Sequence, residues 1–353
     1  MKYKLIDKFI SKELFNSEIE NLKKKSWVLV GHLKEFKNFN DYKTLEIFNL
    51  PVIIYNIQGN IKAFTNICPH RGSRIKLKDK GCEVFKCEYH GWAFNKDGRL
   101  ISGPFIKEAF ENLNIRDVRL ETWKIDLCGG FIFITHHLNK NVSLRDYLGK
   151  QFKLLDIFSN NFHEIVSTEE YIWNCNWKIA VENSIDEYHG PILHSNTFKR
   201  VLDLKPHYSY DKNFLSVEMP LNKNYLSNLK NISKYFEEKN LNQTYIHSLV
   251  FPISTLASTM GIFNFLQIYS PISVNKTKIY TNIYFSKLNV KEDKKLKNIK
   301  NHLIDSAKKF NKEVFFEDKN ICEDLQKNLD KGFIFSKFGK FENRIKKFRD
   351  QVL

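Results

Sequence analysis

The sequence lacks low-complexity segments, internal repeats and any long unbroken apolar run. These absences argue against a disordered chain and a repeat array. Hydrophobic residues make up 42% and aromatic residues 14% of the 353 positions, which is enough to build folded cores along the whole chain. Because this length exceeds the usual size of one domain, we expect two.

Signals for export and for membrane insertion are also missing. Residues 1–11 alternate Lys and Asp with apolar residues and lack the apolar core of a secretory signal, so we expect a cytoplasmic protein. Residues 248–275 contain no charge, but Pro252, Gly261 and Pro271 interrupt them, together with many Ser, Thr and Asn. Buried strands lining a cavity fit this segment better than a membrane helix, and no membrane partner is expected.

An arginine-rich stripe that could follow a phosphate backbone is absent as well. The formal net charge of +16 comes mostly from lysines spread over every segment, so nucleic-acid binding is not expected. Two interpretations of the charge remain. It is either a solvated lysine-rich surface or an attraction for an acidic partner such as a reductase or ferredoxin.

The hydrophobic pattern changes along the chain. Apolar residues recur at helical spacing from Ile6 to Lys25, and short β-branched or aromatic runs then alternate with turns, including a hairpin turn at 58–60. From about residue 164 the pattern is mixed, with a strand at 279–285 and a long helix at 298–329. We predict an α+β protein, with a small all-β domain ahead of an antiparallel sheet backed by helices. The expected division is an N-terminal helix at 1–26 packed on the last domain, an all-β domain at 27–140 and a mixed α+β domain at 141–353.

Cysteines and histidines gather in one short region of the predicted β domain. Cys68-Pro69-His70 is followed by Cys87-Glu88-Tyr89-His90, so two successive loops each offer one thiolate and one imidazole. Disulfides are not expected in a cytosolic chain of this size, and the group is interpreted as metal ligands. The remaining cysteines, Cys82, Cys128, Cys175 and Cys322, are interpreted as buried core residues.

Three metal sites compete for these ligands. Zinc accepts the ligand types, but the spacing departs from common zinc fingers. A plant-type ferredoxin would use Cys82 and Cys87, yet His90 stands where its third cysteine should be. A Rieske [2Fe–2S] cluster uses all four ligands, Cys68, His70, Cys87 and His90. The run resembles the C-x-H … C-x-x-H-G-W pattern of the Rieske family at every marked position, and Gly98 and Pro104 stand where that family places a covering loop.

A second constellation lies at residues 186–194. Asp186 and His189 are three residues apart and would share a helix face, whereas His194 is five residues beyond His189. Gly190 and Pro191 are expected to break the helix between the two histidines and to let both imidazoles meet. Two His and one carboxylate form the facial triad of non-haem Fe(II) oxygenases. Ordinary histidines within a helix are the alternative.

The third ligand is expected in the C-terminal helix. Its apolar residues recur at Leu303, Ala307, Phe310, Val314, Ile321 and Leu325. The position after Val314 on this seam falls at Glu317 or Asp318, and a carboxylate on a buried stripe is costly unless it binds a cation. Spacing alone does not choose between the two.

These segments resemble the catalytic domain of Rieske non-haem iron oxygenases, the aromatic-ring-hydroxylating alpha-subunit family. The D-x-x-H-x4-H run matches at Asp186, His189 and His194, and the segment from Glu317 to Gln326 is similar to the one that carries the ligand aspartate. The resemblance therefore implies Asp318 as the third iron ligand and a mild effect of removing Glu317. It also implies that Asp186 bonds the first iron-ligating His and reaches the cluster His of a neighbouring subunit.

The resemblance further implies a function. A reductase or ferredoxin would carry electrons from NAD(P)H to the cluster, and Asp186 would pass them to a mononuclear Fe(II) that activates O2. The product would be a hydroxylated or demethylated small molecule of aromatic or quaternary-amine type. A homotrimer is implied because the cluster and iron of one chain would lie too far apart. The alternative is a Rieske electron carrier without oxygenase activity.

Aromatic residues of the uncharged segment and its neighbour are candidates for the substrate pocket. Phe251, Phe263, Phe265 and Tyr284 would suit an apolar or a cation-binding pocket. Plain core packing in strands is the alternative for each of them.

Overall fold

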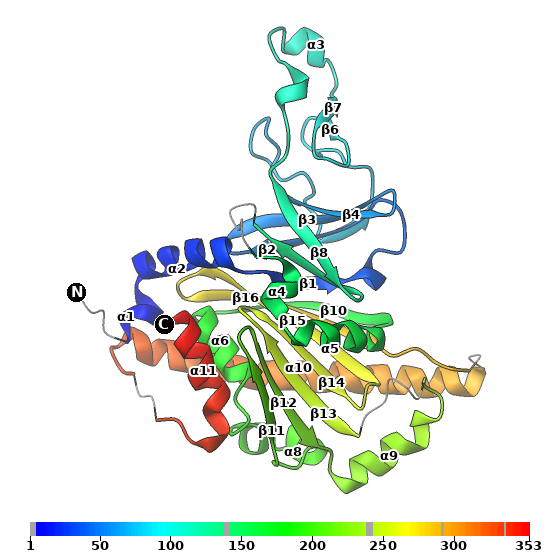
Figure 1. Ribbon diagram of the computed structural model, residues 1–353, viewed down its shortest axis with the longest axis vertical. Coiled ribbons are helices and arrows are strands. Elements are labelled where there is room, and N and C mark those ends of the chain that lie inside the picture. Colours follow the sequence, from blue (N-terminus) through cyan, green and yellow to red (C-terminus); the bar gives the residue numbers. More distant parts are fainter. Residues whose placement is uncertain (1–4, 137–141, 238–242, 291–292, 335–336) are drawn as a thin grey trace.

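The structure is a computed structural model that describes residues 5–136, 142–237, 243–290, 293–334 and 337–353. Two seven-stranded antiparallel sheets form the body of the molecule, and a two-stranded hairpin projects from the first sheet at one end (Figure 1). The sheets pack on each other through a shared core and through direct hydrogen bonds. Ser254 Oγ donates to Leu29 O over 2.8 Å, and Glu46 N donates to Tyr280 Oη over 2.8 Å.

The first sheet has the order β1-β9-β8-β4-β3-β2-β5 and is accompanied by the hairpin β6-β7. Its elements are β1 (Val28–His32), η1 (Leu33–Glu35), β2 (Asp41–Ile47), β3 (Leu50–Ile57), β4 (Asn60–Thr65), β5 (Lys80–Cys82), β6 (Ala93–Phe94), β7 (Leu100–Ser102), α3 (Ile106–Ala109), η2 (Ile115–Asp117), β8 (Thr122–Cys128) and β9 (Phe131–Thr135). The predicted hairpin turn joins β3 to β4. Its central residues Gln58 and Gly59 have φ values of 53° and 86°, which is the backbone twist that tight hairpins require.

The second sheet has the order β10-β16-β15-β14-β13-β12-β11. The elements that build and cover it are α4 (Leu144–Leu148), α5 (Gln151–Phe158), η3 (Ser159–Asn161), β10 (Glu164–Trp173), α6 (Trp177–Ser184), α7 (Gly190–Leu193), α8 (Phe198–Val201), β11 (His207–Asp211), β12 (Phe214–Pro220), α9 (Lys223–Ser233), β13 (Thr244–Val250), β14 (Ser254–Thr259), β15 (Phe263–Ser273), β16 (Lys276–Phe285), α10 (Lys294–Asp330), η5 (Lys340–Glu342) and α11 (Asn343–Val352). The long helix α10 crosses this sheet (Figure 1). The predicted α+β class, with an antiparallel sheet backed by helices, is confirmed.

The N-terminal segment differs from the single helix predicted for it. Two helices, α1 (Asp7–Ile10) and α2 (Lys12–Lys25), meet at Ser11, whose extended backbone ends the first and whose side chain caps the second. A serine competes for backbone hydrogen bonds and favours such a cap over a helix interior. The expected boundary between residues 140 and 141, like residues 1–4 of the expected N-terminal unit, lies outside the described residues.

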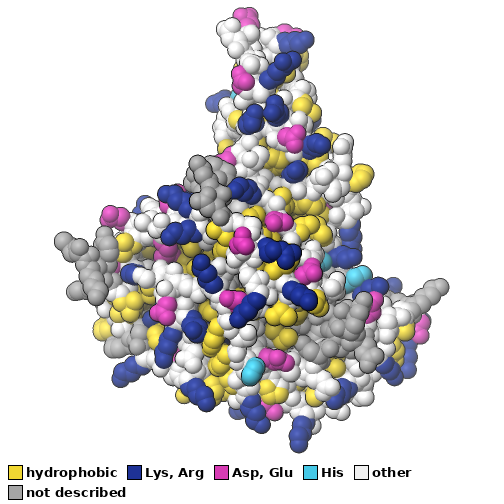
Figure 2. Space-filling view, viewed as in Figure 1, with side chains coloured by type: hydrophobic (Ala, Val, Ile, Leu, Met, Phe, Trp, Pro, Cys, Tyr) yellow, Lys and Arg dark blue, Asp and Glu magenta, His cyan; other side chains and the backbone are white. Residues whose placement is uncertain are grey.

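The uncharged segment at 248–275 forms the end of β13 and all of β14 and β15. Among the described residues, we find no helix with the length and apolarity needed to cross a membrane. Lys and Arg side chains are dispersed over both halves of the face shown in Figure 2, with Asp and Glu between them. This distribution matches the lysine pattern of the sequence.

Candidate metal centres and substrate cavity

Two loops of the first sheet carry the predicted cluster residues. In each loop a glycine with a positive φ donates its N–H to the carbonyl of the cysteine four residues earlier, Gly72 to Cys68 over 2.9 Å and Gly91 to Cys87 over 3.0 Å. Both cysteines are buried, and the rings of His70 and His90 lie with centroids 4.5 Å apart. The matching turns therefore bring two thiols and two imidazoles together.

The chemistry of these four residues fits a Rieske cluster. Nδ1 of His70 is buried and has no hydrogen-bond partner, as expected for an atom directed at a metal. Burial raises the pKa of the Cys68 thiol to about 11, while the backbone N–H of His70 works in the opposite direction. Bound iron would remove the thiol proton, because the thiolate is the ligand.

Of the two residues expected in a covering loop, Pro104 lies against Gly91, next to His90, whereas Gly98 lies beside Phe64 and Leu120. A Cβ placed on Gly91 would lie 3.1 Å from the Pro104 ring, so the two loops touch, and a side chain there would be strained because Gly91 has a φ of 73°. Gly98 has a φ of 74° and turns the chain from β6 into β7. Trp92 stacks on His70 with ring centroids 4.6 Å apart and closes the remaining side.

The second constellation lies where α6 ends and α7 begins. The prediction that Asp186 and His189 share a helix face is wrong, because α6 ends at Ser184 and both residues lie in the bend that follows. The predicted break at Gly190 and Pro191 is also wrong. Pro191 stands in the first turn of α7, where its missing N–H costs nothing, so the pair starts a helix and does not interrupt one. His189 and His194 therefore flank α7.

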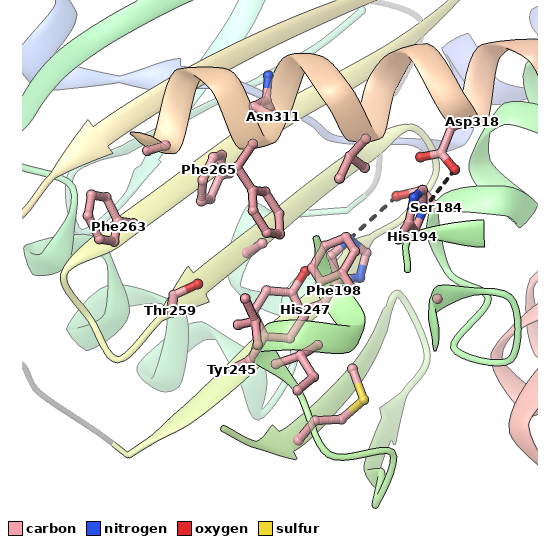
Figure 3. Close-up of a pocket in the computed structure, with 18 of the residues that line it drawn as sticks. Ser184, His194, Phe198, Tyr245, His247, Thr259, Phe263, Phe265, Asn311 and Asp318 are labelled. Atoms are coloured by element: carbon pink, nitrogen blue, oxygen red, sulfur yellow. Dashed lines mark hydrogen bonds and ion pairs between the residues drawn. The ribbon is translucent and has the colours of Figure 1, made fainter. Parts of the chain in front are cut away.

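Asp318 of α10 completes the constellation. His194 Nε2 lies 3.1 Å from His189 Nε2 and 3.1 Å from Asp318 Oδ1, and His189 Nε2 lies 3.6 Å from the same oxygen. Figure 3 shows Asp318 projecting from α10 toward His194. Asp318 Oδ1 is buried and makes no hydrogen bond of good geometry. Because two histidine nitrogens and one orphaned carboxylate oxygen converge, the residues fit the facial triad of an Fe(II) site.

Two further carboxylates bind the outer nitrogens of the histidines. Asp186 Oδ2 lies 3.1 Å from His189 Nδ1, and Glu317 Oε2 lies 2.6 Å from His194 Nδ1. Burial lowers the pKa of His194, but Asp318 and Glu317 outweigh burial, so the net shift is upward. Each carboxylate accepts a hydrogen bond from Nδ1–H and leaves Nε2 facing the other residues of the group. Sequence reasoning placed Glu317 beside the site but missed this contact.

The predicted apolar seam of α10 holds only for its first half. Leu303, Ala307, Phe310 and Val314 line a cavity, whereas Ile321 and Leu325 are exposed. After Asp318 the buried face continues at Cys322, Gln326 and Leu329. Gln326 accepts a hydrogen bond from the backbone N–H of Asn176 over 2.8 Å, so a polar contact holds this part of the helix in place. Apolar spacing does not reveal such a contact.

Buried ion pairs fix α6 and the bend after it from both ends of the chain. Glu18 of α2 accepts from Lys178 Nζ and from Trp177 Nε1, each over 2.6 Å. Arg349 of α11 binds Glu182 through Nε over 2.7 Å and Nη2 over 2.6 Å. A third pair joins Arg344 of α11 to Glu187, next to Asp186. The sequence offers no local signal for these pairs, because the partners lie far apart along the chain.

A cavity of about 440 Å³ opens beside the three converging residues, between α10 and the second sheet (Figure 3). Such a volume suits a small organic ligand. Of the four aromatic candidates, Phe263 and Phe265 line the cavity. Tyr284 instead belongs to the core and donates to Glu35 over 2.6 Å, and Phe251 packs against Phe348.

Comparison with known families gives two matches along the chain. Residues 26–123 match the Rieske [2Fe-2S] domain, and residues 161–353 match the catalytic domain of the ring hydroxylating alpha subunit. The second match covers more than half of the 353 residues.

Curated relatives include enzymes with different substrates. The chain is 31% identical over 197 residues to the anthranilate 1,2-dioxygenase large subunit of Acinetobacter baylyi, covering 54% of this chain and 42% of that one. It is 32% identical over 189 residues to the carnitine monooxygenase oxygenase subunit of Escherichia coli, covering 52% and 50%. The chain thus spans about half the length of the curated relatives it matches.

Solved structures share the fold over nearly the whole chain. The quaternary ammonium Rieske monooxygenase CntA in complex with L-carnitine has a TM-score of 0.77 at 22% identity, covering 98% of this chain and 93% of that one. Naphthalene 1,2-dioxygenase with indole bound in the active site has a TM-score of 0.74 at 22% identity, covering 92% and 79%. At such identities the likeness concerns the fold alone.

Proposed function

Because the chain belongs to the ring-hydroxylating alpha-subunit family and carries a Rieske domain ahead of the catalytic domain, we propose that it is a terminal oxygenase. It would take electrons from a reductase or ferredoxin fed by NAD(P)H and hydroxylate or demethylate a small molecule of aromatic or quaternary-amine type. The observation that carries this proposal is the meeting of His189, His194 and Asp318 at the wall of a ligand-sized cavity. A pure electron carrier has no use for such a cavity.

The proposed ligands follow from this geometry. Cys68, His70, Cys87 and His90 would hold the [2Fe–2S] cluster in a domain at 27–140. His189, His194 and Asp318 would hold the iron in a domain at 141–353, with residues 1–26 packed on it through Glu18. When bound, the mononuclear Fe(II) would activate O2 with electrons supplied by the cluster. We also propose that the protein acts in the cytoplasm, where soluble reductases operate.

The protein's own residues would orient the histidine ligands and shield the iron site from water. An ionised carboxylate only accepts hydrogen bonds, so Asp186 and Glu317 keep the protons of their histidine partners on Nδ1 and turn both Nε2 atoms toward the metal. His194 is 1% exposed, and Phe198 lies over it with ring centroids 5.4 Å apart. Water is therefore kept from one side of the site, and substrate enters through the cavity.

We propose a homotrimer in which each cluster serves the iron of a neighbouring subunit. The hairpin β6-β7, beside the cluster residues, and α8, which follows His194, lie at opposite ends of the molecule (Figure 1). Tyr89 and Phe105 of the cluster end are exposed, which suits docking to another chain. Asp186, at the surface edge of the iron site, would then face His90 of the neighbour. The structure of CntA is described in terms of inter-subunit electron transfer.

Mixing two defective chains tests this arrangement. A Cys87→Ser chain would lack the cluster and an Asp318→Ala chain would lack the iron, so neither is active alone. In mixed trimers some neighbours pair an intact cluster with an intact iron, and activity should return. Verified mixed trimers of folded subunits that stay inactive would show that electrons do not cross between subunits.

Iron counting tests the proposed function. The purified protein should contain about three irons per chain, two in the cluster and one mononuclear, with acid-labile sulfide. His189→Ala should lose one iron and keep the cluster spectrum. A protein with only zinc would contradict the cluster, and one with cluster iron alone would favour the electron carrier. Reductase-driven O2 uptake with aromatic acids, aromatic hydrocarbons and trimethylammonium compounds then identifies the substrate class.

A further inference from the structure

The cavity wall carries polar groups that the proposed function does not use, and His247 is one of them. Among the described lining residues, the carboxylates and the arginine are Asp186, Glu187, Asp318 and Arg344, all at the metal end. Further from the metal the lining is mostly apolar. His247 of β13 lies at the border between these two parts, and it is buried.

An aromatic row connects His247 to the iron site. Ring centroids are 5.4 Å apart from His194 to Phe198, 5.7 Å from Phe198 to Tyr245 and 6.4 Å from Tyr245 to His247. Ala257 of β14 stands directly opposite His247 in the sheet. The small methyl group leaves the imidazole uncovered on the cavity side. A ligand lying along this row would contact the imidazole while its other end faces the metal.

Arg344 determines which nitrogen of His247 carries the proton. Its Nη1 donates to His247 Nδ1 over 3.0 Å. A guanidinium only donates, so Nδ1 must accept and carries no hydrogen. Burial lowers the pKa of His247 well below its usual value, and Arg344 lowers it further, so the ring is neutral. The single ring proton is therefore on Nε2, and this tautomer is fixed by a permanently charged neighbour.

The Nε2–H donor is poorly satisfied within the protein. Its only described partner is Ser184 Oγ at 3.4 Å, beyond the usual range for such a bond. Figure 3 marks this contact with a dashed line. Hydroxyls on the wall, such as that of Tyr245, can donate or accept, whereas Nε2–H of His247 can only donate. A ligand with an acceptor atom at this point would gain a hydrogen bond that a hydrocarbon cannot make.

The charges around the cavity indicate whether the acceptor atom of the ligand is neutral or charged. Arg344 is paired with Glu187, so the two contribute no net charge to the cavity. A carboxylate ligand would bring an unpaired charge into a mostly apolar space, which is costly. A neutral carbonyl or ether oxygen avoids that cost and still accepts the hydrogen bond from Nε2–H.

We propose that His247 is a specificity-determining residue that donates from Nε2–H to a neutral oxygen of the substrate, which is otherwise apolar. This proposal rests on the proposed function, because it takes the cavity to be the substrate site. It narrows the aromatic or quaternary-amine alternatives to uncharged molecules that carry a ketone, ether or similar acceptor.

Calorimetric titration of the iron-loaded protein tests the proposal without turnover. The probes are 1-indanone, which carries a carbonyl, and indane, the hydrocarbon of the same rings. The quantity compared between proteins is the ratio of the two dissociation constants, so differences in probe solubility cancel. His247→Leu should reduce the relative preference for the ketone roughly fivefold, the worth of one neutral hydrogen bond. His247→Gln, which keeps an acceptor and a donor, should restore part of it.

His207→Leu is the matched control. It makes the same substitution at an exposed position of β11 in the same sheet, so the ratio should stay at the wild-type value. The fold should tolerate His247→Leu, because Arg344 Nη1 also reaches the backbone oxygens of His247 at 3.1 Å and Leu215 at 3.4 Å.

Several outcomes would overturn the proposal. They are an unchanged ratio in His247→Leu, a fall of the same size in His207→Leu, or no binding of 1-indanone to the wild-type protein. Tighter binding of benzoate or phenyltrimethylammonium than of 1-indanone would also overturn it, because a charged ligand would then be preferred. Iron counting remains a separate test, so a protein that prefers the ketone but holds no mononuclear iron would contradict only the oxygenase function.

Discussion

The two proposed metal sites, called here the cluster end and the iron end, are built in opposite ways. The four residues proposed for the cluster lie within 23 consecutive positions, from Cys68 to His90, on loops that repeat the same turn. The residues proposed for the iron come from two segments, His189 and His194 on either side of α7 and Asp318 on α10, and distant ion pairs hold these segments. A site on local turns can lie near the surface and accept electrons, whereas a site between elements can be enclosed and exclude water.

Substitution of one proposed ligand at each end should give the largest effects, and it tests whether each metal centre forms without the other. Asp318→Ala should abolish mononuclear iron and product formation but leave the cluster absorbance intact. Cys87→Ser should do the reverse, removing the cluster and keeping one iron. Metal analysis with visible absorbance measures both. Asp324→Ala, an exposed change on the same helix, is the control. Loss of both centres in either variant would show that the two ends do not form separately.

Removal of a buried ion-pair partner should affect the iron end alone. Glu18→Ala leaves Lys178 buried and unpaired, which should lower the free energy of unfolding by about 3–5 kcal/mol. Denaturant unfolding measures this change. Glu20→Ala, from an exposed pair on the same helix, should cost less than about 1 kcal/mol. An equal cost for the two variants would mean that Glu18 has no special role in holding α6.

Glu317 sharpens the comparison, because its bond to His194 has no counterpart at the cluster end described here. Glu317→Ala should weaken iron binding about tenfold to a hundredfold, the usual effect of removing the partner of a metal-bound histidine. This expectation replaces the mild effect inferred from the sequence. Glu317→Gln keeps an acceptor and should lie closer to wild type. Iron retention during chelator competition measures the difference, and unchanged retention in Glu317→Ala would exclude the role.

Asp186 should have the smallest effect on the metals and a specific effect on electron transfer. Asp186→Asn should keep both centres and the trimer but slow electron transfer by about tenfold or more, because a neutral amide is a weaker acceptor for a histidine proton. Rapid mixing of the reduced protein with O2 and substrate measures the rate of cluster oxidation. A wild-type rate would leave Asp186 with only a structural role.

The sequence predicted the cluster end more fully than the iron end, because local turns leave a pattern in the sequence and contacts between distant segments do not. The spacing of Cys68, His70, Cys87 and His90 predicted that they converge because it records a local turn. His189 and His194 also converge as predicted, although the backbone expected between them was wrong, since Pro191 both breaks and begins helices. The helical spacing could not decide whether Glu317 or Asp318 is the third iron ligand, because both carboxylates contact His194, one at each ring nitrogen. Arg344 and His247 were missed, because their contacts depend on the packing of α11 against β13.

The ion pairs that hold α6 against α2 and α11 affect the order in which the protein can fold during synthesis. Arg344 and Arg349 are translated after every other residue of the iron site, so the bend that carries His189 lacks two of its three buried partners until α11 leaves the ribosome. The cluster loops are complete about 250 residues earlier and need neither arginine. Binding of iron at the proposed site would therefore wait for α11, whereas the fold that carries the proposed cluster residues can form while the second half is still being made.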